Sequence, residues 1–406
     1  MTSENKPPLY PVATRDRRCP LDPAPAHREF APLQRGRIWD DTQPWLVSTN
    51  ALFKKLIADP RVSNDIRNDA YPSATPAFKE LRVRGGLSTF DRRDGDEHAI
   101  IRRIVMSHFS PKQMNAIRPA VQAHLDSIFD KVMAGNSQID IVADLAYPFS
   151  SVVLFELIGI PYSDYDRLSV LAYKLVNAAS TPDQAISAFG ELKAYLADML
   201  DNIGPDQQNG VLAQMANEQL RQGIMTRDQV LDTVSLLISG GYETTANTIS
   251  LATYALLSAP EQWADLRDHA DDVSIVRMAV EELLRFTTVT HFGRRRVALE
   301  DIEIEDVTIK AGEAIVFVDD VCNRDPAAFR GDPDTLDIRR DARGHVAFAF
   351  GPHNCAGNLL ARMELAVFFS TLAKRMPNLK FATDPETLVF QETSQIYGIQ
   401  ALPVTW

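Results

Sequence analysis

The segment FAFGPHNCAG, residues 348–357, contains the strongest indication of fold in this 406-residue chain. It places Cys355 directly before an apolar, periodic stretch, Asn358 to Arg375, which predicts a helix. Backbone N–H groups are unpaired at a helix N-terminus and the helix dipole is positive there, so we expect a lowered pKa for the Cys355 thiol and a site suited to a metal. A lone cysteine is as often a buried apolar side chain, so its position alone leaves both interpretations open.

The residues around Cys355 decide between these interpretations. Gly351 and Gly357 let the backbone fold tightly against a flat partner, and Phe348 packs beside the sulfur and excludes water. The spacing of Phe348, Gly351, Cys355 and Gly357 resembles the haem-binding loop of the cytochrome P450 family, closest to its soluble bacterial members. The resemblance covers nearly the whole chain. It implies haem b as the cofactor and Cys355 as the ligand of its iron.

The hydrophobic pattern predicts a mainly α-helical protein with a minor β region. Apolar residues recur at helical spacing from about residue 94 to 285, including 114–132, 164–178 and 185–203. After residue 285, the segments VALEDIEIEDVTI and KAGEAIVFV alternate or carry β-branched runs, which predicts a few strands. We therefore expect the P450 fold, a single haem-thiolate domain over residues 1–406 that begins with an extended segment up to about residue 25.

Composition excludes several classes of protein. The net charge of -12 argues against a nucleic-acid binder. Three scattered cysteines are too few for a disulfide framework, which indicates a reducing compartment. The first 27 residues carry charge and proline but no apolar run, so we predict no signal peptide, no membrane anchor and a cytoplasmic location.

A glycine pair lies inside the predicted helix from Arg227 to Ser258, which we expect to be interrupted at residues 239–245, SGGYETT. Each interior glycine costs about 1 kcal/mol relative to alanine, so a functional role or close helix packing must compensate. The resemblance implies that Gly240 and Gly241 make room for O₂ beside the haem. It also implies that Thr244 hydrogen-bonds the distal oxygen while Glu243 relays protons from solvent.

Four polar residues match positions that contact the haem propionates in the family, and buried propionates need such donors. His98 and Arg102 are four apart on a predicted helix, Arg296 begins a predicted strand, and His353 precedes Cys355 by two residues. Any one of them alone would more commonly be an exposed polar group. The resemblance implies further haem contacts from Gly240, Gly241, Phe348 and Gly357.

Glu282 and Arg285 are three apart on a predicted helix and therefore share a face. Such pairs are commonly solvated at the surface, but the apolar residues before and between them favour burial. The resemblance implies a structural role, in which the pair locks onto the segments 323–326 and 337–340.

The resemblance also predicts a substrate pocket of apolar and small polar side chains, which suits a small, mostly hydrophobic organic substrate. Its predicted residues are Leu87, Phe90, Leu236, Ser239, Val289, Thr290, Phe292, Gln395 and Ile396.

We interpret the chain as a monooxygenase that inserts one atom of O₂ into this substrate. The sequence contains no flavin or iron–sulfur motif, so the resemblance implies ferredoxin and ferredoxin reductase as electron donors. An acidic donor would dock on the basic residues near the cysteine loop, although a solvated face is the alternative; these are Arg103, Arg339, Arg340, Arg343 and Arg362. Two other functions stay open: haem-thiolate reduction of nitric oxide or use of peroxide, and a non-catalytic haem sensor. Family members that reduce nitric oxide or use peroxide tend to lack the acid and alcohol that Glu243 and Thr244 provide here. A haem sensor would not need these two side chains.

Overall fold

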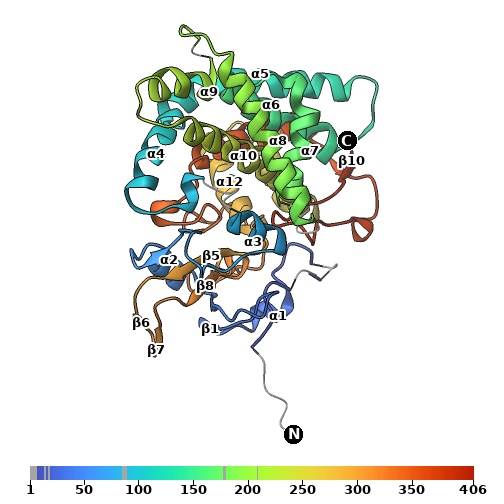
Figure 1. Cartoon of the computed structure of the whole chain (residues 1–406). Helices are drawn as coiled ribbons and strands as arrows, with labels where there is room; N and C mark the ends of the chain where they lie inside the picture. Colours follow the sequence, from blue (N-terminus) through green and yellow to red (C-terminus); the bar gives the residue numbers. More distant parts are fainter. Residues whose placement is uncertain (1–6, 13–14, 17–18, 85–88, 177–179, 208) are drawn as a thin grey trace.

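A large helical body and a smaller sheet region make up the computed structural model, which describes residues 7–12, 15–16, 19–84, 89–176, 180–207 and 209–406. In Figure 1 the long helices fill the upper part, and the sheet that contains β5 and β8 lies below them with the N-terminal segment. The prediction of a mainly α protein with small sheets is confirmed.

The helical elements vary from one turn to 32 residues. The α-helices are α1 (Pro25–Arg28), α2 (Asn50–Ile57), α3 (Pro76–Val83), α4 (Gly95–His108), α5 (Pro111–Met133), α6 (Tyr147–Ile158), α7 (Tyr165–Val176), α8 (Pro182–Asp201), α9 (Gly210–Gln214), α10 (Arg227–Ser258), α11 (Pro260–Asp268), α12 (Val273–Thr287), α13 (Asp319–Cys322) and α14 (Asn358–Arg375). Single turns of 3-10 or π geometry are η1 (Phe90–Arg92), η2 (Ile141–Ala146), η3 (Tyr162–Asp164), η4 (Met215–Leu220), η5 (Gly351–His353) and η6 (Pro385–Thr387).

The strands form one sheet of five strands and two smaller sheets. They are β1 (Leu33–Arg35), β2 (Trp45–Val47), β3 (Val62–Ser63), β4 (Gln138–Asp140), β5 (Arg294–Ala298), β6 (Ile302–Ile304), β7 (Val307–Ile309), β8 (Ala314–Phe317), β9 (Lys380–Phe381) and β10 (Pro403–Thr405). The larger sheet has the order β1-β2-β8-β5-β3, and the smaller ones are β4-β10-β9 and β6-β7. In the larger sheet β5 pairs antiparallel with β8. Strand β5 is mostly buried and begins with three consecutive arginines.

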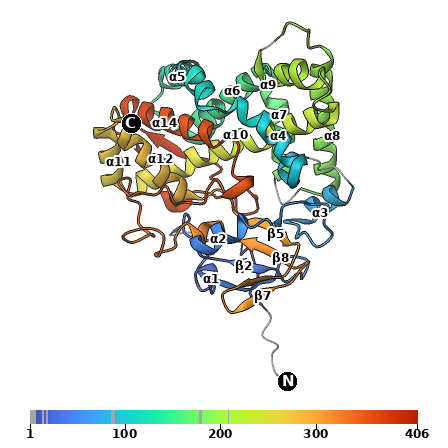
Figure 2. The ribbon, with the colours of Figure 1, turned by 90° about the vertical axis from the view of Figure 1, so that its left-hand side faces the viewer.

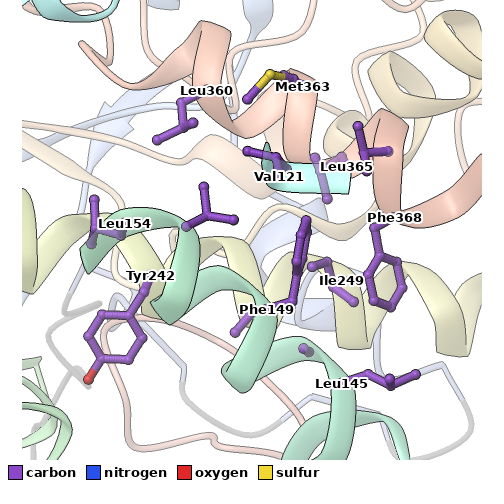
Figure 3. Packing of buried hydrophobic residues seen from close by; sticks show 14 of the residues in the cluster. Val121, Leu145, Phe149, Leu154, Tyr242, Ile249, Leu360, Met363, Leu365 and Phe368 are labelled. Carbon is purple, nitrogen blue, oxygen red and sulfur yellow. The ribbon is translucent and has the colours of Figure 1, made fainter. Parts of the chain in front are cut away.

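Helix α10 crosses the middle of the helical body and packs on α6, α8, α12 and α14 (Figure 2). It starts at a capping box, in which the Thr226 hydroxyl accepts from the backbone of Gln229 and the Gln229 side chain bonds back to Thr226. Figure 3 shows the apolar contact between α10, α6 and α14, made by side chains such as Ile249, Phe149 and Phe368. The central helix is therefore fixed along its length by the main core.

The predicted interruption of this helix at residues 239–245 is wrong, because α10 is assigned as one α-helix through that stretch. The Thr244 hydroxyl donates to the carbonyl of Gly240 at 2.9 Å, and the Thr245 hydroxyl donates to that of Gly241 at 3.2 Å. Threonine hydroxyls that bond back to the preceding turn bend a helix without breaking it.

Among the described residues, one stretch, Ile141–Ile158, is long and apolar enough by composition to cross a membrane. It comprises η2 and α6, and 61% of it is buried inside the structure. A helix at the core of a globular body has this same character.

Candidate active site

A cavity of about 410 Å³ lies between α10, strand β5 and the loop that precedes α14. It brings together residues that the sequence analysis predicted from widely separated segments. The predicted residues in its wall are Phe90, Arg102, Leu236, Gly240, Gly241, Thr244, Thr290, Phe292, Arg296, Phe348, His353, Cys355, Gly357, Gln395 and Ile396. Predicted cofactor and substrate positions therefore share one cavity.

Cys355 opens onto this cavity from the loop before α14. Its backbone N–H donates to the carbonyl of Phe348 at 2.9 Å, which folds the loop back on itself. Burial raises the pKa of the Cys355 thiol, although the Gly357 N–H and nearby Arg294 oppose this effect. The predicted lowering of this pKa is therefore wrong, because desolvation outweighs the helix terminus. A bound metal ion would deprotonate the thiol all the same.

The loop owes its shape to two residues with left-handed backbone geometry, Ala349 at φ 60° and Gly351 at φ 74°. A Cβ at Gly351 would also lie 3.2 Å from Ala58, so glycine is required there on two grounds. Arg294 of β5 donates to the carbonyl of Ala347 at 2.8 Å and ties the sheet to the loop.

Several buried nitrogen atoms near the cavity have no hydrogen-bond acceptor among the described residues. Whether these donors suit the carboxylates of a haem is the first test of fit. Arg296 is 4% exposed and donates to Asn64 at 2.8 Å, but its Nε has no acceptor among the described residues. Nδ1 of His353 and Nε2 of His98 are also buried without partners there, while Nε2 of His353 lies 2.9 Å from the Asp94 carboxylate. Unpaired buried donors of this kind fit the two carboxylates that a haem carries.

His98 contributes behind the wall and not within it. Its ring stacks on that of His353 with centroids 4.1 Å apart. Burial, together with the neighbouring His353 and Arg102, lowers the pKa of His98 to about 4. It is therefore a neutral imidazole at pH 7, and Arg102 supplies the positive charge on α4.

The glycines provide the second test of fit. A Cβ built at Gly240 or at Gly357 would meet no atom within 4 Å, so both faces are open to a flat molecule. A Cβ at Gly241 would lie 2.6 Å from Leu154 of α6, which is the close helix packing that the sequence left as an alternative. The thiol, the unpaired donors and the open glycine faces together fit a haem.

Thr244 and Glu243 lie on different sides of α10. Thr244 is in the wall of the main cavity, whereas Glu243 borders a second cavity of about 480 Å³ with Tyr147, Tyr165 and Lys174. Glu243 is 2% exposed, neither carboxyl oxygen has a partner among the described residues, and burial raises its pKa to about 7. Successive helical residues point about 100° apart, which places the two side chains on different sides of the helix. The roles predicted for Thr244 in oxygen binding and for Glu243 in proton relay stay predictions.

Two predicted pocket residues of the described chain are not in the cavity wall. Ser239 bonds instead to the carbonyl of Leu236 at 3.3 Å, and Val289 packs against the main core. Leu87 lies outside the described residues. Several residues that line the cavity were not predicted from the sequence. They lie in the segment that leads into α4 and at the start of β5, and include Tyr71, Ala74, Phe78, Arg92, Arg294 and Arg295. The sequence RRR, residues 294–296, could have indicated that Arg294 and Arg295 also line the cavity, since Arg296 was already predicted to do so.

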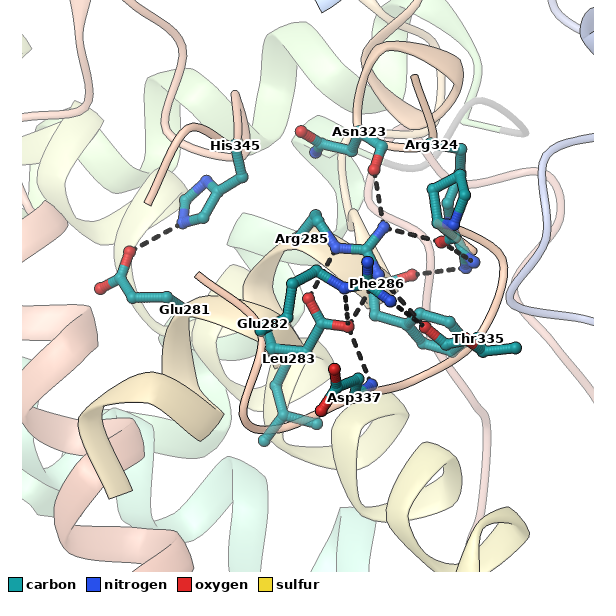
Figure 4. A network of polar contacts seen from close by, with 12 residues as sticks. Glu281, Glu282, Leu283, Arg285, Phe286, Asn323, Arg324, Thr335, Asp337 and His345 are labelled. Atoms are coloured by element: carbon teal, nitrogen blue, oxygen red, sulfur yellow. Dashed lines mark hydrogen bonds and ion pairs between the residues drawn. The ribbon is translucent and has the colours of Figure 1, made fainter. Parts of the chain in front are cut away.

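Glu282 and Arg285 are fully buried and form a two-point ion pair with both N···O distances 2.7 Å (Figure 4). Arg285 also donates to the carbonyl of Asn323 at 2.8 Å, and Glu282 accepts from the backbone N–H of Asp337 at 3.0 Å. Arg340 completes the network at 3.2 Å from Glu282. The network joins α12 to the two segments that the sequence analysis named.

The five arginines predicted to form a docking surface do not act alike. Arg340 is 6% exposed and belongs to the buried network, so its assignment to the surface is wrong. Arg339, Arg343 and Arg362 are each paired with a carboxylate of Asp265, Asp341 or Glu281. Arg103 is exposed on α4.

Comparison with known proteins agrees with this geometry. GfsF of Streptomyces halstedii, a cytochrome P450, is 39% identical over 403 residues, which are 98% of this chain and 96% of that protein. Pentalenic acid synthase of Streptomyces avermitilis is 37% identical and covers 100% of this chain and 99% of its own.

Solved structures give the same result at the level of the fold. The crystal structure of GfsF has a TM-score of 0.89 at 38% identity and covers 98% of this chain and 100% of its own. The mycinamicin VIII C21 methyl hydroxylase MycCI of Micromonospora griseorubida also has a TM-score of 0.89, at 32% identity, with coverage of 98% and 100%. The family model described as "Cytochrome P450" matches residues 165–388, a range that contains α10, the Glu282–Arg285 pair and Cys355. On its cysteine loop, its cavity and these relatives, the chain belongs to the cytochrome P450 family.

Proposed function

We propose that the protein is a haem-thiolate monooxygenase that inserts one atom of O₂ into a small, mostly hydrophobic organic molecule. The observation that carries this proposal is Cys355 opening onto the same cavity as Thr244, with buried nitrogen donors nearby that have no acceptor among the described residues. Relatives named as a monooxygenase, a dihydroxylase and a hydroxylase support it. When bound, the haem supplies the iron that activates O₂, and a thiolate ligand favours cleavage of the O–O bond.

The residues that would hold the haem divide into three groups. Cys355 would ligate the iron, and Arg102, Arg296 and His353 would bind the propionates, with His98 stacked behind His353. Gly240, Gly357 and Phe348, which line the same cavity, would lie against the faces of the haem ring. We propose haem b, because the sequence contains no C-x-x-C-H motif for covalent attachment.

We propose that α10 separates two tasks in proton handling. Glu243 has a pKa of about 7, so at neutral pH it can both take up and release a proton on the side of the second cavity. The Thr244 hydroxyl lies in the main cavity and holds its place through the carbonyl of Gly240. With its hydrogen donated to that carbonyl, its oxygen would accept a hydrogen bond from a water molecule there and so orient it.

The cavity wall supports an apolar substrate with a few polar contacts. Phe78, Phe90 and Phe292 supply aromatic surface, and Thr290 and Gln395 supply the neutral hydrogen-bonding groups.

We further propose that ferredoxin and ferredoxin reductase deliver the electrons, that the enzyme is cytoplasmic, and that residues 1–406 form one functional unit. The last point is supported by a cavity wall that draws on residues from Asn64 to Ile396.

The test is spectroscopic and then chemical. Purified protein should bind haem and show the thiolate-type Soret band in its reduced carbon monoxide complex, and Cys355→Ala should lose that band. Cys322→Ala, which changes a buried cysteine away from the cavity, is the matched control. With NADH, a ferredoxin, its reductase and ¹⁸O₂, the product should carry one labelled oxygen. A thiolate band that persists in Cys355→Ala would remove the assignment, and product formed with peroxide alone or nitric oxide consumed instead would favour the other haem-thiolate chemistries.

A further inference from the structure

The cavity wall contains more positive charge than a haem can neutralise. Its described residues include five arginines and a single carboxylate, that of Asp91; the arginines are Arg92, Arg102, Arg294, Arg295 and Arg296. Arg92 pairs with Asp91 at 3.2 Å, and Arg294 pairs with buried Asp319. Two propionates would neutralise Arg102 and Arg296. Arg295 is then the surplus cation.

Arg295 is buried without a counter-ion. It is 7% exposed, and its only hydrogen bond among the described residues joins Nη1 to the carbonyl of Gly293 at 3.2 Å. Nε and Nη2 are both withdrawn from solvent and have no acceptor there. Burial lowers the pKa of Arg295 and neighbouring Arg92 lowers it further, while only the tyrosines Tyr10 and Tyr71 oppose them. A charge in this state needs an anion, because bulk water does not reach it.

The unpaired edge of Arg295 has the geometry that binds a carboxylate. Nε and Nη2 are the two nitrogens with which Arg285 holds Glu282, at 2.7 Å each, elsewhere in this protein. A guanidinium edge of this kind forms two parallel hydrogen bonds to the two oxygens of a carboxylate. Arg295 lines the same cavity as Tyr71 and Phe78, and because its Nε–Nη2 edge is withdrawn from solvent, a ligand in the cavity reaches that edge by a rotation of the side chain.

Its position on β5 separates Arg295 from the propionate donors. Side chains alternate across a strand, so Arg295 points to the opposite face from Arg294 and Arg296. Val297, two residues on and therefore on the same face, packs with Ile66 and Tyr71, and Phe78 borders that cluster. This face adjoins the segment before α4, where Phe78 is also part of the cavity wall.

We propose that the substrate is an amphipathic organic acid, whose carboxylate binds the Nε–Nη2 edge of Arg295 while its apolar part lies against the aromatic wall. This inference rests on the proposed function and specifies its substrate class. Arg92, whose charge Asp91 offsets, lies 5.2 Å from the Phe78 ring centroid and covers that ring. Neutral molecules of the same shape would bind more weakly, since they leave the buried charge unpaired.

The experiment compares acids with their amides on the haem-loaded protein. Binding of decanoate and decanamide, and of 4-phenylbutanoate and 4-phenylbutanamide, is measured at pH 8 by the shift of the Soret band and by calorimetry. The acid of each pair should bind at least about tenfold more tightly, the low end for a hydrogen bond to a charged group. Arg295→Gln should abolish this preference. Arg82→Gln is the matched control, because Arg82 is a partly buried arginine that bonds to the carbonyls of Ile66 and Asn68 outside the cavity wall.

A second measurement separates substrate binding from haem binding. Haem transfer to apomyoglobin should proceed at the wild-type rate from Arg295→Gln and faster from Arg296→Gln. Equal or absent binding of acid and amide in both wild-type pairs would overturn the proposal. So would an Arg295→Gln variant that loses haem rapidly yet keeps the preference for acids, since Arg295 would then serve a propionate. Loss of the thiolate-type Soret band in the wild type would contradict the proposed function instead.

Discussion

A carboxyl group without hydrogen-bond partners is harder to ionise than one in water, and Glu243 has no such partner among the described residues. Its raised pKa of about 7, against an ordinary value of 4.5, comes from burial beside the second cavity. The neighbouring Thr244 has no titratable group, and its hydroxyl serves the main cavity. Substitutions at these two adjacent residues should therefore have different consequences.

Thr244→Ala should leave haem content and substrate binding near those of the wild type but divert electrons from product into hydrogen peroxide. The reason is the loss of the only hydroxyl that we place beside bound O₂. Glu243→Gln should instead slow turnover by about 10²-fold, the low end for a positioned acid–base group. The measurement is NADH consumed, product formed and peroxide released by each variant. Wild-type rate and coupling in both would show that α10 does not carry the protons.

Glu243→Gln should also change how stability depends on pH. Because the folded-state pKa of Glu243 lies above the unfolded value, the folded protein holds the extra proton between about pH 4.5 and 7. Wild-type stability is therefore lost as pH rises through this window, and the glutamine variant escapes that loss. Relative to wild type, the variant should gain up to about 3 kcal/mol between pH 4 and pH 8. Urea unfolding at both pH values measures the gain, and a difference independent of pH would contradict it.

At the scale of elements, the Glu282–Arg285 pair determines where the segments before the cysteine loop lie. The pair is fully buried, and its further hydrogen bonds include those to the backbone of Asn323, Pro333 and Asp337. These segments belong to the chain between β8 and α14, which the described structure leaves mostly without regular elements. Backbone of this kind takes its position from such side-chain bonds.

Arg285→Ala should destabilise the protein by about 3 kcal/mol, the low end for a broken buried pair, because Glu282 loses its two-point partner but keeps Arg340 at 3.2 Å. Arg285→Lys should recover only part of this loss, since one ammonium cannot make the paired bonds of a guanidinium. Arg339→Ala is the control: its pair with Asp265 is exposed and should contribute less than about 1 kcal/mol. Thermal unfolding and soluble yield are the measurements. Equal losses from Arg285→Ala and Arg339→Ala would show that burial of the pair contributes nothing.

The helices whose bounds were predicted best are those whose ends and buried faces are marked by residues inside the helix or next to it. The bounds of α10 and α14 were predicted correctly, because a capping box begins α10 and a continuous apolar pattern fills both helices. The contacts that sequence could not predict depend on distant partners. The residues next to Arg340 in the sequence do not show that it reaches Glu282, and those next to Arg295 do not show that it lacks a carboxylate partner among the described residues. The separation of Glu243 from Thr244 was predictable, since adjacent residues never share a helix face.

At the scale of the whole molecule, net charge and its local exceptions bear on the encounter with an electron donor. The chain carries a net charge of -12, and three of the arginines once grouped as a docking surface are already paired with carboxylates. Arg103 on α4 is exposed and has no ion pair among the described residues, so the docking of an acidic partner at Arg103 stays a prediction.

Reduction by a ferredoxin should slow as ionic strength rises, since encounters of this kind are steered by charge and screened by salt. Arg103→Glu should lower the rate and flatten its salt dependence. Arg343→Glu is the matched control, because the charge of Arg343 is offset by Asp341. Stopped-flow reduction over a series of salt concentrations measures both. A rate that ignores salt, or that falls equally in the two variants, would place the donor elsewhere.

The cavity wall draws on residues from Asn64 to Ile396, so it is complete only when segments separated by most of the chain have met. Contacts of such long range form slowly and late in folding. A cofactor that binds the finished cavity, and not the unfolded chain, shifts the folding equilibrium by mass action. We therefore expect a larger supply of haem in the producing cell to let more of the newly made polypeptide escape proteolysis, so that the yield of intact protein should rise with cofactor synthesis.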